Sequence, residues 1–103
     1  MASSTFKKDA PIIKRDQFQY TVSSLAANTS RRVTAAELGY AVPEGYSACG
    51  VVIAAASVNT VTVRSVNATI GFVDIRNVSG SAASSILVTL TVSFIRSDLY
   101  EAI

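Results

Sequence analysis

Apolar and hydroxyl-bearing residues alternate along much of the second half of this chain. The alternation is clearest over residues 86–94, where every second position is large and apolar and Thr or Ser fills most of the positions between. Side chains of a β-strand point alternately to its two faces, so this pattern predicts a long strand with one face in a core and the other in water. The apolar positions are Ile86, Val88, Leu90, Val92 and Phe94.

Similar patterns predict further strands, separated by turn signals. We expect them over residues 17–22, 30–34, 48–56, 61–66 and 68–77, with a loop at 79–85 before the last strand at 86–95. The segment at 48–56 is a continuous run of small and apolar residues, which is consistent with a strand buried on both faces. In the segment at 68–77, Asp74 and Arg76 fall on one face, where they are placed to form a surface ion pair.

One short helix interrupts the strands. Thr34 and Glu37 are spaced as a capping box, in which the Thr hydroxyl and the Glu carboxylate each accept a hydrogen bond from a free amide at a helix start. Gly39 follows at the position that usually closes a helix. A single helical turn is therefore expected near residues 35–38. A tight turn is expected at 42–45, where Pro43 and Gly45 occupy favoured positions.

A chain of 103 residues forms one domain, and short turns without a regular alternation of strands and helices indicate antiparallel sheets. We predict an all-β fold, an antiparallel β-sandwich of jelly-roll-like form with one short helical turn near residues 35–38. Residues 1–15 are expected to be a loosely ordered lead-in whose last part, with Ile12 and Ile13, docks on the body. The sandwich domain is expected to span residues 16–103.

The chain is poor in charge. Of its residues 16% are charged and 50% hydrophobic, against roughly 25% charged residues in an average soluble domain. A small domain with more apolar surface than it can bury favours association with other copies. The net charge of +2 is small and its basic residues are not interleaved with aromatics, which argues against nucleic-acid binding. No apolar run is long enough for a membrane helix, and the first residues do not form a signal peptide.

Residues suited to catalysis or metal binding are few. The chain has no histidine, which excludes Ser-His-Asp, Cys-His and His-based metal sites within one chain. Its single cysteine, Cys49, lies among small and apolar residues and is expected to be a buried structural thiol. Glu44 and Asp74 are the conceivable pair of carboxylates for glycoside hydrolysis. We predict a protein that is not an enzyme and has no catalytic residue, metal or cofactor.

Ligand-binding residues are harder to exclude. Tyr40 and Tyr46 flank the turn that contains Glu44, and loop tyrosines can stack on sugar rings while their hydroxyls form hydrogen bonds. These three residues are the candidate ligand-binding site. The alternative is that both tyrosine rings pack the turn against the sandwich. Arg64, which lies among valines and threonines, either reaches a partner subunit or lines a solvated face.

Three segments carry a resemblance to known proteins. They are Tyr20-Thr21-Val22-Ser23-Ser24-Leu25-Ala26-Ala27, then Thr34-Ala35-Ala36-Glu37-Leu38-Gly39 leading into Val42-Pro43-Glu44-Gly45-Tyr46, and finally Val73-Asp74-Ile75-Arg76-Asn77-Val78-Ser79. Over residues 17–96 the chain resembles the small β-sandwich domains of tail and baseplate proteins from bacteriophages and prophages of Gram-positive, often gut, bacteria. The resemblance implies a trimer that contacts saccharides of the host surface. The receptor-contacting residues of such domains vary, so no functional residue is carried over.

The sequence and the resemblance together predict a non-enzymatic virion structural protein. It is expected to be a homotrimer that is made in the cytoplasm of the bacterial host and located in the virion tail. Its expected partners are other tail or baseplate proteins and a host surface glycan. Two alternatives stay open: a monomeric carbohydrate-binding module or bacterial surface adhesin, which would use Tyr40 and Tyr46 as an exposed platform, and a capsid decoration protein.

Overall fold

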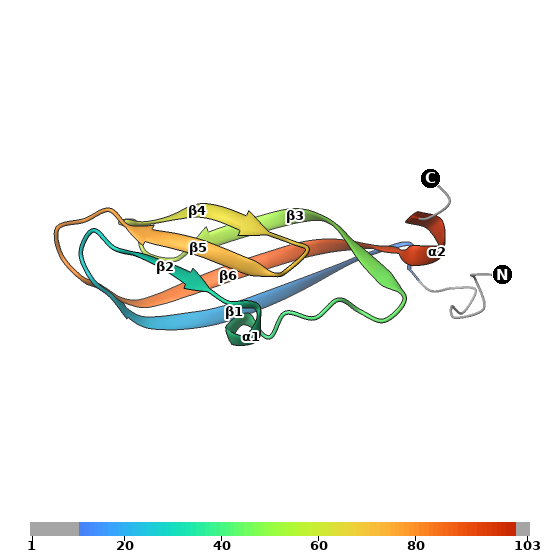
Figure 1. Ribbon diagram of the computed structural model, residues 1–103, viewed down its shortest axis with the longest axis horizontal. Helices are drawn as coiled ribbons and strands as arrows, with labels where there is room; N and C mark the ends of the chain where they lie inside the picture. Colours follow the sequence, from blue (N-terminus) through green and yellow to red (C-terminus); the bar gives the residue numbers. More distant parts are fainter. Residues whose placement is uncertain (1–10, 101–103) are drawn as a thin grey trace.

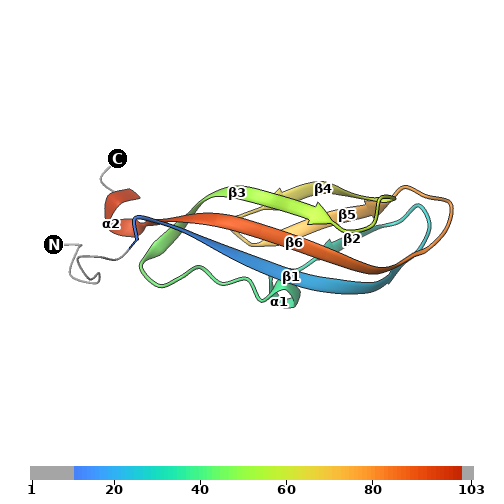
Figure 2. The same cartoon turned by 180° about the vertical axis from the view of Figure 1, so that it is seen from behind.

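The computed structural model describes residues 11–100 and shows, within them, two three-stranded antiparallel sheets packed face to face (Figures 1 and 2). The long sheet has the order β1-β6-β3, with β1 (Ile13–Leu25), β6 (Ala83–Arg96) and β3 (Tyr46–Ala56). The short sheet has the order β2-β5-β4, with β2 (Ser30–Val33), β5 (Phe72–Asn77) and β4 (Val61–Asn67). The helices are α1 (Ala35–Leu38) and α2 (Ser97–Tyr100). The predicted antiparallel β-sandwich is confirmed.

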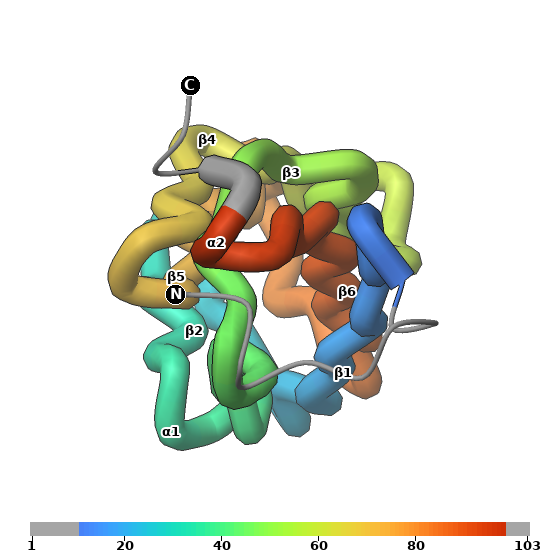
Figure 3. The backbone as a smooth tube through the Cα atoms, turned by 90° about the vertical axis from the view of Figure 1, so that its right-hand side faces the viewer, coloured from blue at the N-terminus to red at the C-terminus, as the bar shows by residue number. Residues whose placement is uncertain are grey.

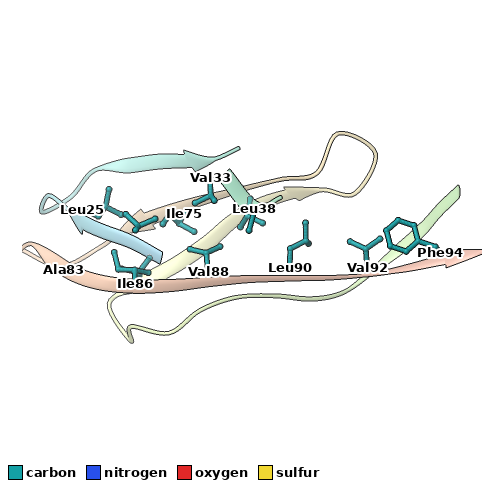
Figure 4. Close-up of a cluster of buried hydrophobic side chains, with 13 residues drawn as sticks. Leu25, Val33, Leu38, Ile75, Ala83, Ile86, Val88, Leu90, Val92 and Phe94 are labelled. Carbon is teal, nitrogen blue, oxygen red and sulfur yellow. The ribbon is translucent and has the colours of Figure 1, made fainter. Parts of the chain in front are cut away.

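The hydrophobic core lies between the two sheets, and the inner face of β6 forms its longest row (Figure 4). The five apolar residues that the alternation places on one face of β6 are all 0% exposed. On the short sheet, Val33, Val73 and Ile75 are also 0% exposed and face this row. Burial of a large aliphatic side chain stabilises a fold by about 1.5–3 kcal/mol, so the β6 row is a major source of stability. The other core residues are Val22, Leu25, Leu38, Val61 and Ala83.

The helix α1 has the capping box that the sequence predicts. The Glu37 amide donates to Thr34 Oγ1 at 3.3 Å, and the Thr34 amide donates to Glu37 Oε1 at 3.0 Å. Gly39 closes the helix with a φ of 69°, in the left-handed region that favours glycine. The prediction of one helical turn at residues 35–38 is confirmed, because the signals that begin and end this helix are local.

The turn before β3 lies one residue later than predicted. The Tyr46 amide donates to the Pro43 carbonyl at 3.0 Å, so the four residues of the turn are 43–46 rather than 42–45. Gly45 has a φ of 84°, which suits the third position of a type II turn. Gly45 therefore occupies the third position of the turn, where a positive φ is required, rather than the fourth position that the sequence predicted.

The strand β3 is not buried on both faces, and this prediction is wrong. Among the described residues it is an edge strand that pairs with β6 alone, and Val51, Val52 and Ile53 are 38%, 42% and 46% exposed. Its register with β6 shifts around Cys49 and again around Val52, as at β-bulges. Cys49 is consequently exposed rather than buried. A run of apolar residues does not distinguish a central strand from an edge strand, because its pattern carries no information on neighbours.

The strand β1 begins earlier than predicted. It starts at Ile13, so residues 13–15 of the expected lead-in belong to the long sheet, whereas residues 1–10 lie outside the described part of the chain. The Arg96 amide donates to the Ile12 carbonyl at 3.0 Å, and the Tyr46 hydroxyl donates to the Pro11 carbonyl at 2.7 Å. The carbonyls of Pro11 and Ile12, at the end of the lead-in, are thus hydrogen-bonded to the body.

The sandwich is elongated, with principal extents of 56 × 21 × 18 Å. The strands of the long sheet have 11 to 14 residues and those of the short sheet 4 to 7, so the long sheet extends well beyond its partner. The connection from α1 to β3 runs alongside this extension, and Figure 3 shows the two layers along the long axis. The start of β1 and α2 lie at the same end of the molecule, which we call the proximal end (Figure 1).

At the other, distal end, a buried amide side chain forms several of the hydrogen bonds between the loops. The side chain of Asn77 is 0% exposed and donates to the carbonyls of Leu25 at 3.1 Å, Ala26 at 3.4 Å and Ser81 at 2.8 Å. Its oxygen accepts from the Ser79 amide at 3.0 Å. An amide side chain has a nitrogen that donates and an oxygen that accepts, and both atoms of Asn77 form hydrogen bonds here. Asn77 thereby links the loop before β2 to the loop before β6.

Candidate functional site

Tyr40, the first of the three residues predicted to bind a ligand, is part of the packing. Its half-buried ring lies edge-on to Phe18, with ring centroids 5.0 Å apart, and 6.2 Å from the ring of Phe94. Its hydroxyl donates to the carbonyl of Ala68, and burial raises the pKa of this hydroxyl. The ring therefore helps to cover the inner face of the long sheet where the short sheet does not reach.

Tyr46 and Glu44 lie at the proximal end of β3. The Tyr46 hydroxyl donates to Pro11, and the ammonium of Lys14 lies 5.8 Å from the centroid of the Tyr46 ring. Glu44 is exposed within the turn. The two tyrosine hydroxyls thus donate hydrogen bonds to different backbone carbonyls, those of Ala68 and Pro11. This agrees with the interpretation that both rings pack against the sandwich. A part for Tyr40, Glu44 and Tyr46 in ligand binding stays a prediction.

The carboxylates of the described residues are mostly committed to structural contacts. Glu37 accepts from the Thr34 amide and pairs with Arg31 at 2.7 Å, and these two contacts lower the pKa of its carboxyl. Asp98 pairs with Arg96 at 2.9 Å.

Among residues 11–100, no group of three His, Cys, Asp or Glu side chains is placed to hold a metal ion. No helix in that range is long and apolar enough to cross a membrane.

A group of charged side chains lies on the outer face of the short sheet. We call this surface the arginine face. The inward-pointing residues of β5 are Val73, Ile75 and Asn77, so the alternate positions between them point outward. Cross-strand pairing places Arg32 and Ser65 on either side of Asp74, and Ser30 beside Arg76. The arginine face consists of Ser30, Arg32, Arg64, Ser65, Asp74 and Arg76.

Asp74 is the centre of a hydrogen-bonded group on this face. Arg32 Nε donates to Asp74 Oδ1 at 2.8 Å and Arg32 Nη2 to Oδ2 at 3.1 Å, which is a two-point guanidinium–carboxylate contact. Ser65 Oγ donates to Oδ2 at 2.8 Å. These bonds, that from Arg32 above all, hold the pKa of the Asp74 carboxyl below its usual range. A carboxyl held in this ionised state is poorly suited to act as the general acid of a glycosidase.

The ion pair between Asp74 and Arg76 that the sequence suggested does not form. Its partner is Arg32, on the neighbouring strand, whereas Arg76 Nη1 donates to Ser30 Oγ at 3.2 Å. The guanidinium of Arg32 also lies over the ring of Phe72, 3.7 Å from its centroid. Two residues directly opposite each other on paired strands lie closer together than two residues that are two positions apart on one strand. The latter are separated by about 6.6 Å along the strand. Cross-strand pairing therefore decides this contact.

A β-bulge brings Arg64 to the same face. The register between β4 and β5 shifts between Val63 and Ser65, so Arg64 is an extra residue. Arg64 and Ser65 both line a shallow depression of about 520 Å³, and the charge of Arg64 helps to lower the pKa of Asp74. The depression is lined by Ser30, Arg31, Arg32, Arg64, Ser65 and Asp74.

The sequence contains only part of the signal for this site. The alternation in β5 shows that Asp74 and Arg76 share a face, but Arg32 and Arg64 come from two other strands, and nothing in the sequence marks the bulge.

Comparisons with protein-family models, with curated proteins and with solved structures find no match for this chain. The resemblance to tail and baseplate domains therefore stays a prediction from the sequence.

Proposed function

We propose that this chain is a non-enzymatic structural protein of a phage or prophage virion, a homo-oligomeric tail-associated domain that contacts saccharide on the host surface. The tail, the trimeric state and the saccharide come from the resemblance. The structure supports the self-association, and the observation that carries it is the exposed edge strand β3.

The two edges of the long sheet are unlike each other. β1 carries Lys14, Arg15 and Asp16, and such charges protect an edge strand from pairing with another chain. β3 carries no charge, and no charged residue occurs between Glu44 and Arg64. Its exposed residues Val51, Val52 and Ile53 are consecutive. An apolar edge of this kind favours burial against a second copy of the chain.

The elongated shape agrees with a domain that projects from a larger assembly. The start of β1 and α2 lie together at the proximal end, so the loops at 26–29 and 78–82 lie at the opposite end of the long axis (Figures 1 and 2). These loops consist of small uncharged residues. In the proposed function, the proximal end faces other tail or baseplate proteins and the rest of the sandwich faces outward.

Light scattering on the purified chain as it leaves a sizing column tests this proposal. A mass near three times 10.8 kDa supports the homotrimer. A mass of 10.8 kDa at all concentrations would overturn it and favour the monomeric carbohydrate-binding module. Immunogold labelling of purified virions separates the two remaining locations, because a tail component labels the tail and a capsid decoration protein labels the head.

A further inference from the structure

The arginine face carries more positive charge than its own carboxylate neutralises. Three guanidinium groups, those of Arg32, Arg64 and Arg76, share this surface with one carboxylate. Asp74 is already bound to Arg32 and Ser65. Within residues 11–100, neither Arg64 nor Arg76 forms an ion pair. The guanidinium of Arg64, which lines the depression, is therefore available to bind an external anion. That of Arg76, which donates to Ser30 Oγ at 3.2 Å, adds positive charge to the same face.

Asp74 shows how this surface accepts a carboxylate. Arg32 gives it two parallel hydrogen bonds and Ser65 gives a third, with distances of 2.8 to 3.1 Å. Arg64, beside Ser65, offers the same planar donor group to a second carboxylate on the solvent side of the depression. The serine hydroxyls of Ser30 and Ser65 add donors and acceptors for the hydroxyls of a sugar ring.

The form of the surface favours a saccharide over a nucleic acid. Base recognition on single strands requires exposed aromatic rings, and Phe72, the aromatic residue of the outer face of β5, has its ring covered by Arg32 at 3.7 Å. The excess of positive charge is two, whereas nucleic-acid surfaces neutralise many phosphates. The depression, of about 520 Å³, lies within the size range of small-ligand pockets.

We infer that the arginine face is a binding site for a carboxylate-bearing saccharide, with Arg64 as the main contact to the carboxylate. This inference rests on the proposed function for the saccharide ligand, and it adds the class of saccharide and the surface that binds it. It also assigns a function to the bulge in β4, which places Arg64 beside Ser65.

The test is calorimetric titration of the purified chain with short oligogalacturonates, and with neutral galacto-oligosaccharides of the same length. Arg64→Ala removes the proposed contact. Arg15→Ala is the matched control, because Arg15 is also exposed, lies opposite Ser93 on the long sheet and carries the same charge. Asp74→Asn is the third variant, since it removes the internal carboxylate that competes for Arg32.

The acidic oligosaccharide is expected to bind and the neutral one not. Arg64→Ala should weaken binding by about tenfold, as expected for loss of a charge-assisted hydrogen bond. Arg15→Ala should change it by less than about twofold, because a distant exposed charge is screened by salt. Asp74→Asn should bind at least as tightly as the native chain. The inference is overturned if the two arginine variants lose affinity equally, if both oligosaccharides bind alike, or if neither binds.

A nucleic acid is a separate outcome of the same experiment. Binding to an oligonucleotide that exceeds oligogalacturonate binding and depends on Arg64 would overturn the saccharide assignment. The oligomeric state distinguishes this failure from failure of the proposed function. An oligomer without acidic-saccharide binding overturns the inference alone, whereas a monomer with Arg64-dependent binding overturns the proposed assembly and leaves the inference standing.

Discussion

Gly71 lies directly against the ring of Tyr40. A Cβ atom built on Gly71 would be 2.1 Å from Tyr40 Cδ2 and 2.4 Å from Cγ, which is closer than any side chain tolerates. Gly71 also has a φ of 94°, a conformation that residues with a Cβ rarely adopt. Gly71 belongs to the β4–β5 turn and Tyr40 to the connection from α1 to β3. At this contact only glycine leaves room for the Tyr40 ring to pack against the backbone of the turn.

This contact predicts a large effect of Gly71→Ala. Both the overlap with the ring and the strained φ oppose the alanine, so we expect the free energy of unfolding to fall by about 3 kcal/mol. Gly80→Ala is the control, because no atom lies within 4 Å of a Cβ at that position. Urea unfolding followed by tyrosine fluorescence measures both. Equal stability of the two variants would show that Tyr40 moves aside without cost.

Asn77 gives a second prediction about stability. Asn77→Ala leaves the carbonyls of Leu25 and Ser81 and the amide of Ser79 without their partner, and buried polar groups without partners are costly. We expect a loss of about 2–4 kcal/mol in the free energy of unfolding. Asn59→Ala, at an exposed turn, should change it by less than about 0.5 kcal/mol. Faster amide hydrogen exchange at residues 79–82 should accompany the loss, and its absence would contradict the linking role.

The Arg32–Asp74 pair predicts a dependence of stability on pH. The folded pKa of Asp74 is lowered, mainly by the hydrogen bonds from Arg32, so the ionised carboxylate stabilises the folded state. This contribution is fully present above the unfolded pKa of about 3.9 and is lost as the pH falls through the lower folded value. Asp74→Asn should therefore be less stable than the native chain at neutral pH, and the difference should disappear toward about pH 2.

The effect of this pair on stability should be modest and sensitive to salt, because the side chains of Arg32 and Asp74 are 56% and 25% exposed. Chemical unfolding of both proteins across the acidic range, at low and at high ionic strength, measures it. A stability difference that stays constant between neutral and strongly acidic pH would contradict the assignment to Asp74.

The exposed edge of β3 gives a prediction about assembly. Ile53→Lys places a charge among the exposed apolar residues of β3, and inward or edge charges of this kind oppose strand pairing. We expect the variant to remain folded and to shift to the monomer in light scattering. Thr62→Lys makes the same change on the exposed outer face of the short sheet and should keep the native oligomer. An unchanged oligomer in Ile53→Lys would remove β3 from the interface.

Features that depend on nearby residues were predictable from the sequence. The β6 strand follows from alternation alone, because the period of two is a property of the extended backbone. Helix α1 follows from Thr34, Glu37 and Gly39, since capping bonds join residues within one turn. The turn before β3 was displaced by one residue, because Pro43 and Gly45 fit two neighbouring turn positions.

Features that depend on which strands become neighbours were decided by the tertiary structure. The apolar residues of β3 ended at an edge and Cys49 became exposed, since no further strand pairs with β3 among the described residues. The arginine face required Arg32, Arg64 and Asp74 to meet from three strands, with a bulge to place Arg64. Local periodicity determines which face a side chain takes on its own strand. Only the register between strands determines what that side chain meets, and the sequence carries no local signal for it.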